Sequence, residues 1–150
     1  MPKTFLLPLL GFIFMTSCKT KNDEMALFEN DSYLKIELIK SKVVDKNGIG
    51  NEWSFESFVN NYPLNKDIYK LDLTGLHEVI ILSKAIEDDP NHDDIGINRL
   101  RFTPEDTILY KFPNEIEEKV DVKEKYGNGA GKTATCSFTY KVVYDVLNSN

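Results

Sequence analysis

Residues 133–146 read TATCSFTYKVVYDV, and they identify the class of fold more clearly than any other part of the chain. Apolar side chains occupy every second place, namely Ala134, Cys136, Phe138, Tyr140, Val142, Tyr144 and Val146. The places between them are polar except for Val143. Successive side chains of a strand point to opposite faces of a sheet. This period of two, in a run rich in β-branched and aromatic residues, therefore predicts a long central β-strand with one buried face.

Shorter runs of the same alternation recur along the chain. They lie at Leu34–Leu38, Trp53–Phe55, Tyr69–Leu73, Leu100–Phe102, Ile108–Phe112 and Val120–Val122. The mostly apolar stretch His77–Ile86 predicts a strand buried on both faces. Turn signals separate them, among them Asn47-Gly48, Thr103-Pro104-Glu105-Asp106 and Gly127-Asn128-Gly129. No segment shows a sustained helical period. The pattern predicts an all-β domain over residues 33–150, an antiparallel β-sandwich of about eight strands.

Length, composition and charge limit the possible functions. The 150 residues suffice for one ordinary domain, and 41% of them are hydrophobic. Lys and Arg number 18 against 24 Asp and Glu, a formal net charge of -6, which argues against nucleic acid as a partner. The run GNGAGKT at 127–133 is not a nucleotide-binding loop, because Tyr126 stands where that motif needs its first glycine and a strand follows instead of a helix.

The N-terminus has the pattern of an export signal. Lys3 precedes an apolar run, Phe5–Met15, and small residues follow before Cys18. A positive start, a short apolar core and small residues at the cleavage site are typical of a secretory signal peptide, which we expect to occupy residues 1–17. The apolar run is too short for a transmembrane helix, because eleven residues rise only about 16 Å in a bilayer core of about 30 Å.

The residues Met15-Thr16-Ser17-Cys18 resemble the lipobox of bacterial lipoproteins. The resemblance implies that Cys18 is lipidated and anchors the protein to a membrane, with residues 18–32 as anchor and tether. An ordinary signal peptide with a coincidental cysteine is the alternative. Charged residues soon after Cys18 favour the outer membrane or cell surface within the cell envelope. Cys136 would then have no disulfide partner within the chain, and we expect it to be a small buried hydrophobic residue.

Two loops carry carboxylates in patterns that suit a cation. Residues 87–96 read EDDPNHDDIG, with five carboxylates among the first eight residues, and calcium takes 6–8 oxygen ligands. Residues 43–53 read VVDKNGIGNEW, in which Asp45 and Glu52 supply further oxygens. The helix-loop-helix calcium motif does not fit there, because Ile49 occupies a ligand place. The alternatives are a solvated acidic turn for the first loop and an Asn-Gly hairpin turn for the second.

Together the two loops resemble the C-two type of calcium- and phospholipid-binding β-sandwich, a family that places its calcium ligands in two loops at one end. The matching acids are Asp45 and Glu52 in the first loop and Glu87, Asp89 and Asp93 in the later loop. The first loop is followed, as in the family, by a strand that begins with an aromatic residue, 53–55, and the later loop by Asp-Ile-Gly at 94–96. The resemblance implies a calcium site formed by these five acids. Glu replaces the family's Asp at two ligand places.

These features predict a lipid-anchored cell-envelope module that binds a ligand and possesses a calcium site at its acidic loop end. A purely structural envelope lipoprotein without a metal is the alternative. No pattern indicates an enzyme: serines lack a nucleophile-elbow motif, and the two histidines, His77 and His92, suggest no zinc site. An enzyme whose active site assembles only in three dimensions stays open as a third hypothesis. The ligand outside the membrane is not identified by the sequence.

Overall fold

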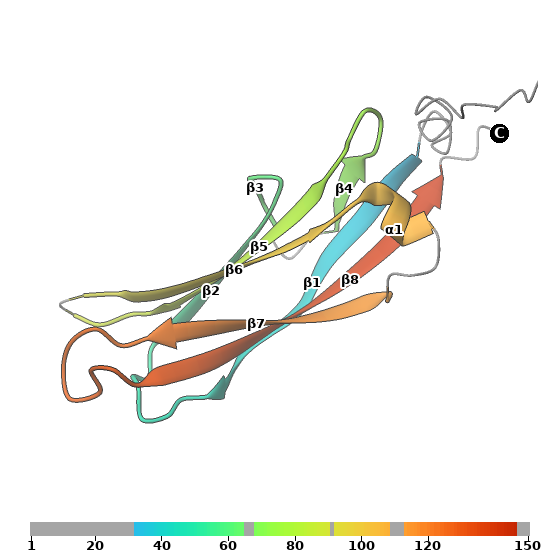
Figure 1. The fold of residues 1–150 in the computed structure, drawn as a ribbon. Coiled ribbons are helices and arrows are strands. Elements are labelled where there is room, and N and C mark those ends of the chain that lie inside the picture. The colour runs from blue at the N-terminus through green and yellow to red at the C-terminus, as the bar shows by residue number, and fades with distance from the viewer. Residues whose placement is uncertain (1–31, 65–67, 91, 109–112, 147–150) are drawn as a thin grey trace, which may run out of the picture.

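The computed structural model describes residues 32–64, 68–90, 92–108 and 113–146. Within these ranges the chain forms eight strands and one short helix (Figure 1). The strands are β1 (Ser32–Asp45), β2 (Trp53–Val59), β3 (Tyr62–Pro63), β4 (Tyr69–Asp72), β5 (Val79–Glu87), β6 (Asp94–Phe102), β7 (Glu115–Lys123) and β8 (Thr133–Val146), and the helix is α1 (Pro104–Ile108). The predicted all-β, eight-stranded sandwich is confirmed.

Two antiparallel sheets of four strands each make up the sandwich. Sheet A has the order β4-β1-β8-β7, and sheet B has the order β3-β2-β5-β6. The two longest strands, β1 and β8, lie in the centre of sheet A and pair from Ser32↔Val146 to Asp45↔Thr135. The chain therefore passes from sheet A to sheet B between β1 and β2. The Asn47-Gly48 turn is present, but the hairpin predicted as its alternative role is wrong, because the strands on either side belong to different sheets.

The core lies between the inward faces of the two sheets. The alternation in β8 correctly predicted which face is buried, since Ala134, Cys136, Phe138, Tyr140 and Val142 are all at most 4% exposed. Cys136 is a free, buried thiol, as expected. Opposite β8, sheet B contributes Val59, Val79, Ile81 and Ala85, none of which has measurable exposure. The apolar residues that alternate in the sequence thus form the inward faces of the two sheets, which pack into one core.

The sandwich closes differently along its two sides. At one side the edge strands β6 and β7 touch: a Cβ added to Gly96 would lie 2.8 Å from Val122 Cγ2 and 2.9 Å from the carbonyl carbon of Asp121. Asn98 Nδ2 on β6 also donates a hydrogen bond to the Lys119 carbonyl oxygen on β7, at 3.0 Å. Only a residue without a side chain permits this close approach of two backbones. At the other side the edges are the short strands β3 and β4.

One element differs in type from its prediction. The segment that begins at Thr103 was predicted as a turn followed by a strand from Ile108, but it forms α1 instead. The Thr103 backbone N–H and side-chain hydroxyl both donate to the Asp106 carboxylate, each at 2.9 Å, and Pro104 occupies the first helical position. These are the features of a capped helix start. The rest of that predicted strand, residues 109–112, lies outside the described residues.

β5 is shorter and less buried than predicted. It begins at Val79, so that His77 and Glu78 lie before it and are exposed. Its inward side chains are buried. On the other face Ile80, Leu82 and Lys84 are only half-buried, and Ile86 is buried. The prediction of a strand buried on both faces is therefore wrong for most of its length, because nothing among the described residues forms a third layer over sheet B. A shallow groove on this outer face is lined by Phe58, Leu82, Ile97 and their polar neighbours.

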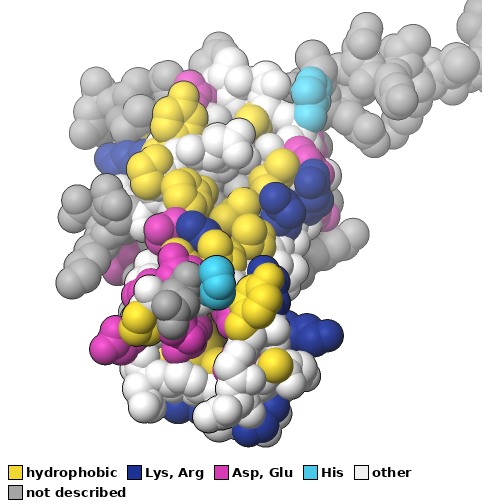
Figure 2. All heavy atoms as spheres, turned by 90° about the vertical axis from the view of Figure 1, so that its left-hand side faces the viewer, with side chains coloured by type: hydrophobic (Ala, Val, Ile, Leu, Met, Phe, Trp, Pro, Cys, Tyr) yellow, Lys and Arg dark blue, Asp and Glu magenta, His cyan; other side chains and the backbone are white. Residues whose placement is uncertain are grey.

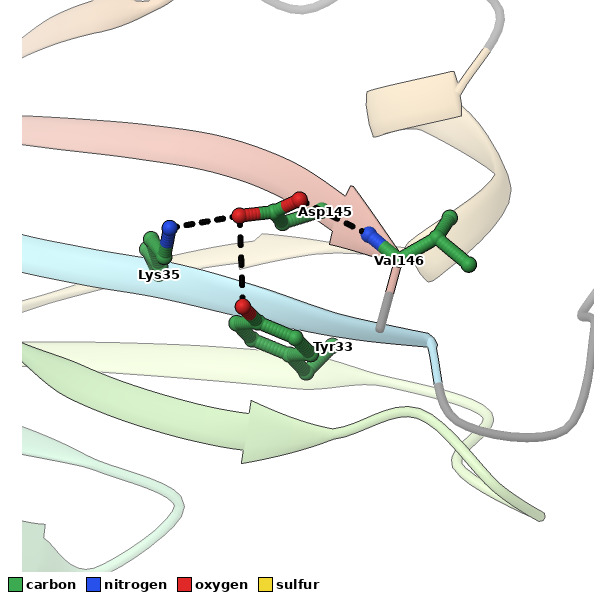
Figure 3. A network of polar contacts seen from close by, with 4 residues as sticks. All are labelled: Tyr33, Lys35, Asp145 and Val146. Carbon is green, nitrogen blue, oxygen red and sulfur yellow. Dashed lines mark hydrogen bonds and ion pairs between the residues drawn. The ribbon is translucent and has the colours of Figure 1, made fainter. Parts of the chain in front are cut away.

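The strands β1 and β8 are joined by side chains near Ser32, at the N-terminal end of the described chain. The Asp145 carboxylate accepts hydrogen bonds from Lys35 Nζ at 2.5 Å, the Tyr33 hydroxyl at 3.2 Å and the Val146 backbone N–H at 2.9 Å (Figure 3). The Lys35 ammonium, which donates the closest of these contacts, holds the pKa of Asp145 below its ordinary value. Because both side chains are about one-third exposed, solvent screens the ion pair.

Candidate functional site

Three connections meet at the end of the sandwich opposite Ser32 (Figure 1). They are the β1–β2 connection (46–52), the described part of the β5–β6 connection (88–93) and the β7–β8 connection (124–132), and we call them together the loop end. The Asp88 backbone N–H donates to the Glu52 carbonyl oxygen at 2.8 Å, which joins the first two connections. The Lys125 backbone N–H lies 3.3 Å from both carboxylate oxygens of Asp94, which joins the third to β6.

The β1–β2 connection folds into a tight turn for local reasons. Asn47 and Gly48 both have positive φ, 46° and 77°, and the Ile49 backbone N–H donates to the Lys46 carbonyl oxygen at 2.8 Å. Asp45 accepts a hydrogen bond from the Asn47 backbone N–H at 2.9 Å, which stabilises the start of the turn. Ile49 is 2% exposed and covers the end of the core. This burial explains why an apolar residue occupies the place of a metal ligand in the motif rejected above.

Glu87 is the buried carboxylate of the loop end. It ends β5, lies between Trp53 and Asp94 in the register of sheet B, and is 6% exposed. Its carboxyl group lies directly over Gly50, so that a methyl group at Gly50 would overlap it. No residue in the described part of the chain forms a hydrogen bond or ion pair with this carboxylate. Burial of this kind disfavours the ionised group, since it removes part of the surrounding water without supplying a partner.

Neighbouring carboxylates further disfavour the ionised form of Glu87. Burial raises the pKa of Glu87 above its ordinary value, and the negative charges of Asp89, Asp94, Glu124 and Asp88 raise it further, in that order. Figure 2, which views the molecule from the loop end, shows acidic side chains gathered beside a histidine. The loop end therefore holds an excess of negative charge around one poorly solvated carboxylate. A cation placed there would lower the electrostatic cost.

Two of these acids are held by backbone groups. Asp94 is 4% exposed and pairs with Glu87 across β5 and β6, and its carboxylate faces the Lys125 backbone N–H. Glu124 Oε1 accepts a hydrogen bond from the Gly129 backbone N–H at 3.1 Å. A Cβ at Gly129 would lie 2.6 Å from the Glu124 carboxyl carbon, so the glycine makes room for this contact. Neither acid was among the predicted calcium ligands.

The five predicted ligands take different positions at the loop end. Glu87 and Asp89 are close enough for the charge of one to shift the pKa of the other. Asp45, Glu52 and Asp93 are exposed and are not among the charges that act on Glu87. In the described ranges, no group of three or more His, Cys, Asp or Glu side chains has an arrangement that could hold a metal ion. The structure thus brings the two predicted loops together without a preformed cage of carboxylates.

Rings from two connections meet beside the acids. The His92 and Tyr126 rings have centroids 4.7 Å apart and are tilted by 39°. Tyr126 is 60% exposed, so a large apolar surface faces solvent at the same end as the carboxylates.

Two glycines of the β7–β8 connection adopt backbone conformations with positive φ. Gly127 and Gly131 have φ values of 83° and 89°, and the Gly131 backbone N–H donates to the Glu124 carbonyl oxygen at 2.9 Å. The connection joins two paired neighbouring strands, β7 and β8, as expected for a hairpin loop with positive-φ residues.

Comparison of the chain with protein-family models and with curated protein sequences found no match. No helix in the described residues is long and apolar enough to cross a membrane. Cys18 and the predicted signal peptide lie outside the described residues.

The sequence contained a signal for Asp94 that the ligand prediction did not use. Asp94 has the same parity as Leu100 and Phe102, whose inward orientation was predicted, so it belongs on the buried face of β6. Asp93, which was chosen instead, precedes the strand and is exposed. Glu124 had no comparable signal, because its place depends on how the β7–β8 connection packs beside β6.

Proposed function

We propose that this protein is a lipid-anchored module of the cell envelope that binds calcium at its loop end and uses that end to contact an envelope or extracellular ligand. The observation that carries the proposal is Glu87, a buried carboxylate without a hydrogen-bond donor that is surrounded by other carboxylates. A divalent cation supplies the positive charge that this arrangement lacks. Calcium suits it better than magnesium, because calcium accepts variable numbers of carboxylate and carbonyl oxygens in flexible loops.

Calcium binding would have to draw the loops together. The charges that act on Glu87 come from the β5–β6 connection, the start of β6 and the β7–β8 connection, while the predicted ligands Asp45 and Glu52 come from the β1–β2 side. The resemblance to the C-two family supports calcium coordination from both predicted loops. Asp94 and Glu124 already have backbone donors, so we assign the first contact with the ion to Glu87.

The place where the described chain begins, Ser32, supports a role for the loop end in binding. Ser32 and the loop end lie at opposite ends of β1, a strand of 14 residues. At about 3.3 Å per residue, this places the loop end roughly 45 Å from the point where the tether enters the domain. With lipid on Cys18, the loop end can face away from the membrane and toward soluble ligands.

The alternative is a structural lipoprotein with a solvated acidic end. The absence of a preformed three-ligand group among the described residues favours it. In that case the raised pKa of Glu87 reflects only burial and repulsion, and the proton itself removes the unfavourable charge. The two functions differ in what calcium does to stability.

A melting experiment with one buried variant and one remote variant separates them. The protein is melted with calcium, magnesium or sodium at matched ionic strength, as wild type, as Glu87→Gln and as Glu115→Gln. Glu115 is an exposed residue at the other end of β7, so its substitution makes the same charge change far from the loop end. A hundredfold excess of calcium over its dissociation constant should stabilise the wild type by about 2.7 kcal/mol, or roughly 10 °C.

We expect Glu87→Gln to abolish this calcium shift and Glu115→Gln to retain it. Without metal, Glu87→Gln should be neutral or mildly stabilising, because it removes a buried charge. If calcium and magnesium gave the same small melting shift in the wild type, the proposed calcium site would be refuted and the structural alternative would be favoured.

A further inference from the structure

A glutamate points into the core of the sandwich far from the loop end. The inward face of β7 carries Ile116, Glu118, Val120 and Val122, and Glu118 lies opposite Phe138 in the register of sheet A. Glu118 is 6% exposed. Glutamate is almost never fully buried without a partner, and here it interrupts an otherwise apolar row. Its burial is favourable only if the carboxyl group is hydrogen-bonded or neutral.

Hydroxyl groups from both sheets form a chain that ends on Glu118. Ser83 Oγ of β5 is hydrogen-bonded to Glu118 Oε2. The Tyr140 hydroxyl of β8 lies 2.6 Å from Ser83 Oγ and 2.8 Å from Ser57 Oγ of β2. The chain therefore joins β7 and β8 of sheet A to β5 and β2 of sheet B. It is a polar contact between the layers inside the hydrophobic core.

The charge of Glu118 sets the direction of this chain, because each hydroxyl has only one proton. With an ionised carboxylate, Ser83 donates to Glu118, Tyr140 donates to Ser83, and Ser57 donates to Tyr140. With a neutral carboxyl group that carries its proton on Oε2, each of these bonds is reversed and Ser57 is the last acceptor. The chain satisfies one oxygen of the carboxyl group. The other oxygen, Glu118 Oε1, is buried and has no hydrogen-bond partner among the described residues.

No positive charge faces Glu118 to compensate an ionised carboxylate. The inward titratable groups on the strands packed around it are Cys136, Tyr140 and Tyr144 of β8, Glu87 of β5 and Asp94 of β6; the inward positions of β2 carry none. No Lys or Arg occurs at the described inward positions of these strands. Ionised Glu118 would thus leave a charged oxygen buried and unpaired, whereas the neutral acid leaves only an uncharged atom.

We propose that Glu118 is protonated in the native sandwich and that loss of this proton, as the pH rises, weakens the contact between the two sheets. The proton sits on the carboxyl group at the end of a hydroxyl chain that couples four strands. The fold thereby contains a pH-sensitive element, independent of the loop end, whose native form is favoured by acidic surroundings.

The direction of the pH effect follows from linkage. Burial raises the pKa of Glu118, and the hydrogen bond from Ser83 offsets part of that rise. The native state therefore keeps the proton at pH values where the unfolded chain has lost it, and stability falls as the pH rises from the unfolded toward the native value. Burial also raises the pKa of Tyr140 to about 12, so the tyrosine keeps its proton throughout this range.

The test compares Glu118→Gln with Glu117→Gln on the whole protein. Glutamine keeps the shape and the acceptor for Ser83 but cannot ionise. Glu117 is the exposed neighbour on the opposite face of β7, where it accepts a hydrogen bond from Ser137 at 2.6 Å. Unfolding equilibrium constants are measured in urea from about pH 5 to pH 9, above the ordinary glutamate pKa of about 4.3.

We expect the wild-type unfolding constant to rise with pH relative to that of Glu118→Gln, by up to about tenfold per pH unit until the native pKa is passed. Glu117→Gln should follow the wild type. The effects of Glu87 occur in all three proteins and cancel. Parallel curves for the wild type and Glu118→Gln would overturn the proposal.

A second measurement keeps the proposal testable if Glu118→Gln does not fold. Carbon-13 spectra of the wild type report the charge of the Glu118 side chain directly through its carboxyl chemical shift. We expect the shift of a neutral acid below the native pKa and a titration above the ordinary glutamate range. A carboxylate shift that titrates at or below the ordinary value would refute it.

Discussion

Phe138 lies at the centre of the packing between the two sheets, and its truncation should cost about 3–5 kcal/mol of unfolding free energy. The side chain is 0% exposed. Its ring meets the Phe55 ring edge-on, with centroids 5.6 Å apart and an interplanar angle of 84°, and stacks on the Tyr140 ring at 6.4 Å. Phe138→Ala removes both ring contacts and leaves a cavity between the layers.

The magnitude follows from area and cavity together. A phenylalanine buries about 150–250 Å², and about 25 cal/mol per Å² gives roughly 4–6 kcal/mol for the whole side chain. The alanine side chain retains a part of this burial free energy, whereas the unfilled cavity lowers the unfolding free energy further. Together these two effects give the range of about 3–5 kcal/mol. This is a large share of the 5–15 kcal/mol typical of a domain.

Urea unfolding of Phe138→Ala and Thr139→Ala measures the difference. Thr139 is the next residue along β8, half-buried on the outer face of sheet A, so its truncation should cost about 1 kcal/mol or less. Equal losses for the two variants would mean that the assignment of faces in β8 is mistaken.

Three further perturbations test other parts of the structure. Gly96→Ala should destabilise by about 1–3 kcal/mol in urea unfolding, because a methyl group overlaps the Asp121 backbone, and an unchanged midpoint would exclude this close contact. Lys35 holds the pKa of Asp145 low, so their ion pair stabilises the native state above the ordinary aspartate pKa and is lost as the pH falls through the native value. Urea unfolding should therefore show the wild type losing stability relative to Asp145→Asn below about pH 4, and a constant difference would contradict this. Native protein should carry acyl mass at Cys18 and partition with membranes, Cys18→Ala should do neither, and a free Cys18 thiol in the wild type would refute lipidation.

Periodicity predicted the faces of the strands well but not their partners. The inward face of β8 follows directly from its alternation, because side-chain direction is a local property of a strand. The pairing of Ser32 with Val146 depends on packing between segments at the two ends of the domain, which no local pattern encodes. Glu118 has the same parity as Val120 and Val122, which assigns it to the inward face of β7, but no prediction was made for it. The helix start at Thr103 was recognisable from its capping residues but was interpreted as a turn.

The loop end was predicted in outline and not in its details. Glu87 and Asp89 are two residues apart at the start of one connection, so their proximity follows from the sequence alone. Glu124 reaches the same region only because β6 and β7 pack edge to edge through Gly96. The direction of each carboxylate depends on backbone donors supplied by other loops. These are properties of the folded chain, and the spacing of acids does not contain them.

The central claim is that calcium binds at Glu87, and titration calorimetry of the full chain in detergent tests it most directly. Calcium is titrated into the wild type and into Glu87→Gln at fixed ionic strength, in two buffers of different ionisation enthalpy. Because burial and neighbouring charges raise the pKa of Glu87, calcium binding should release protons and weaken as the pH falls. The proposal predicts saturable binding with proton release in the wild type and its loss in Glu87→Gln. No binding heat in the wild type, or the same isotherm in both proteins, would contradict the claim.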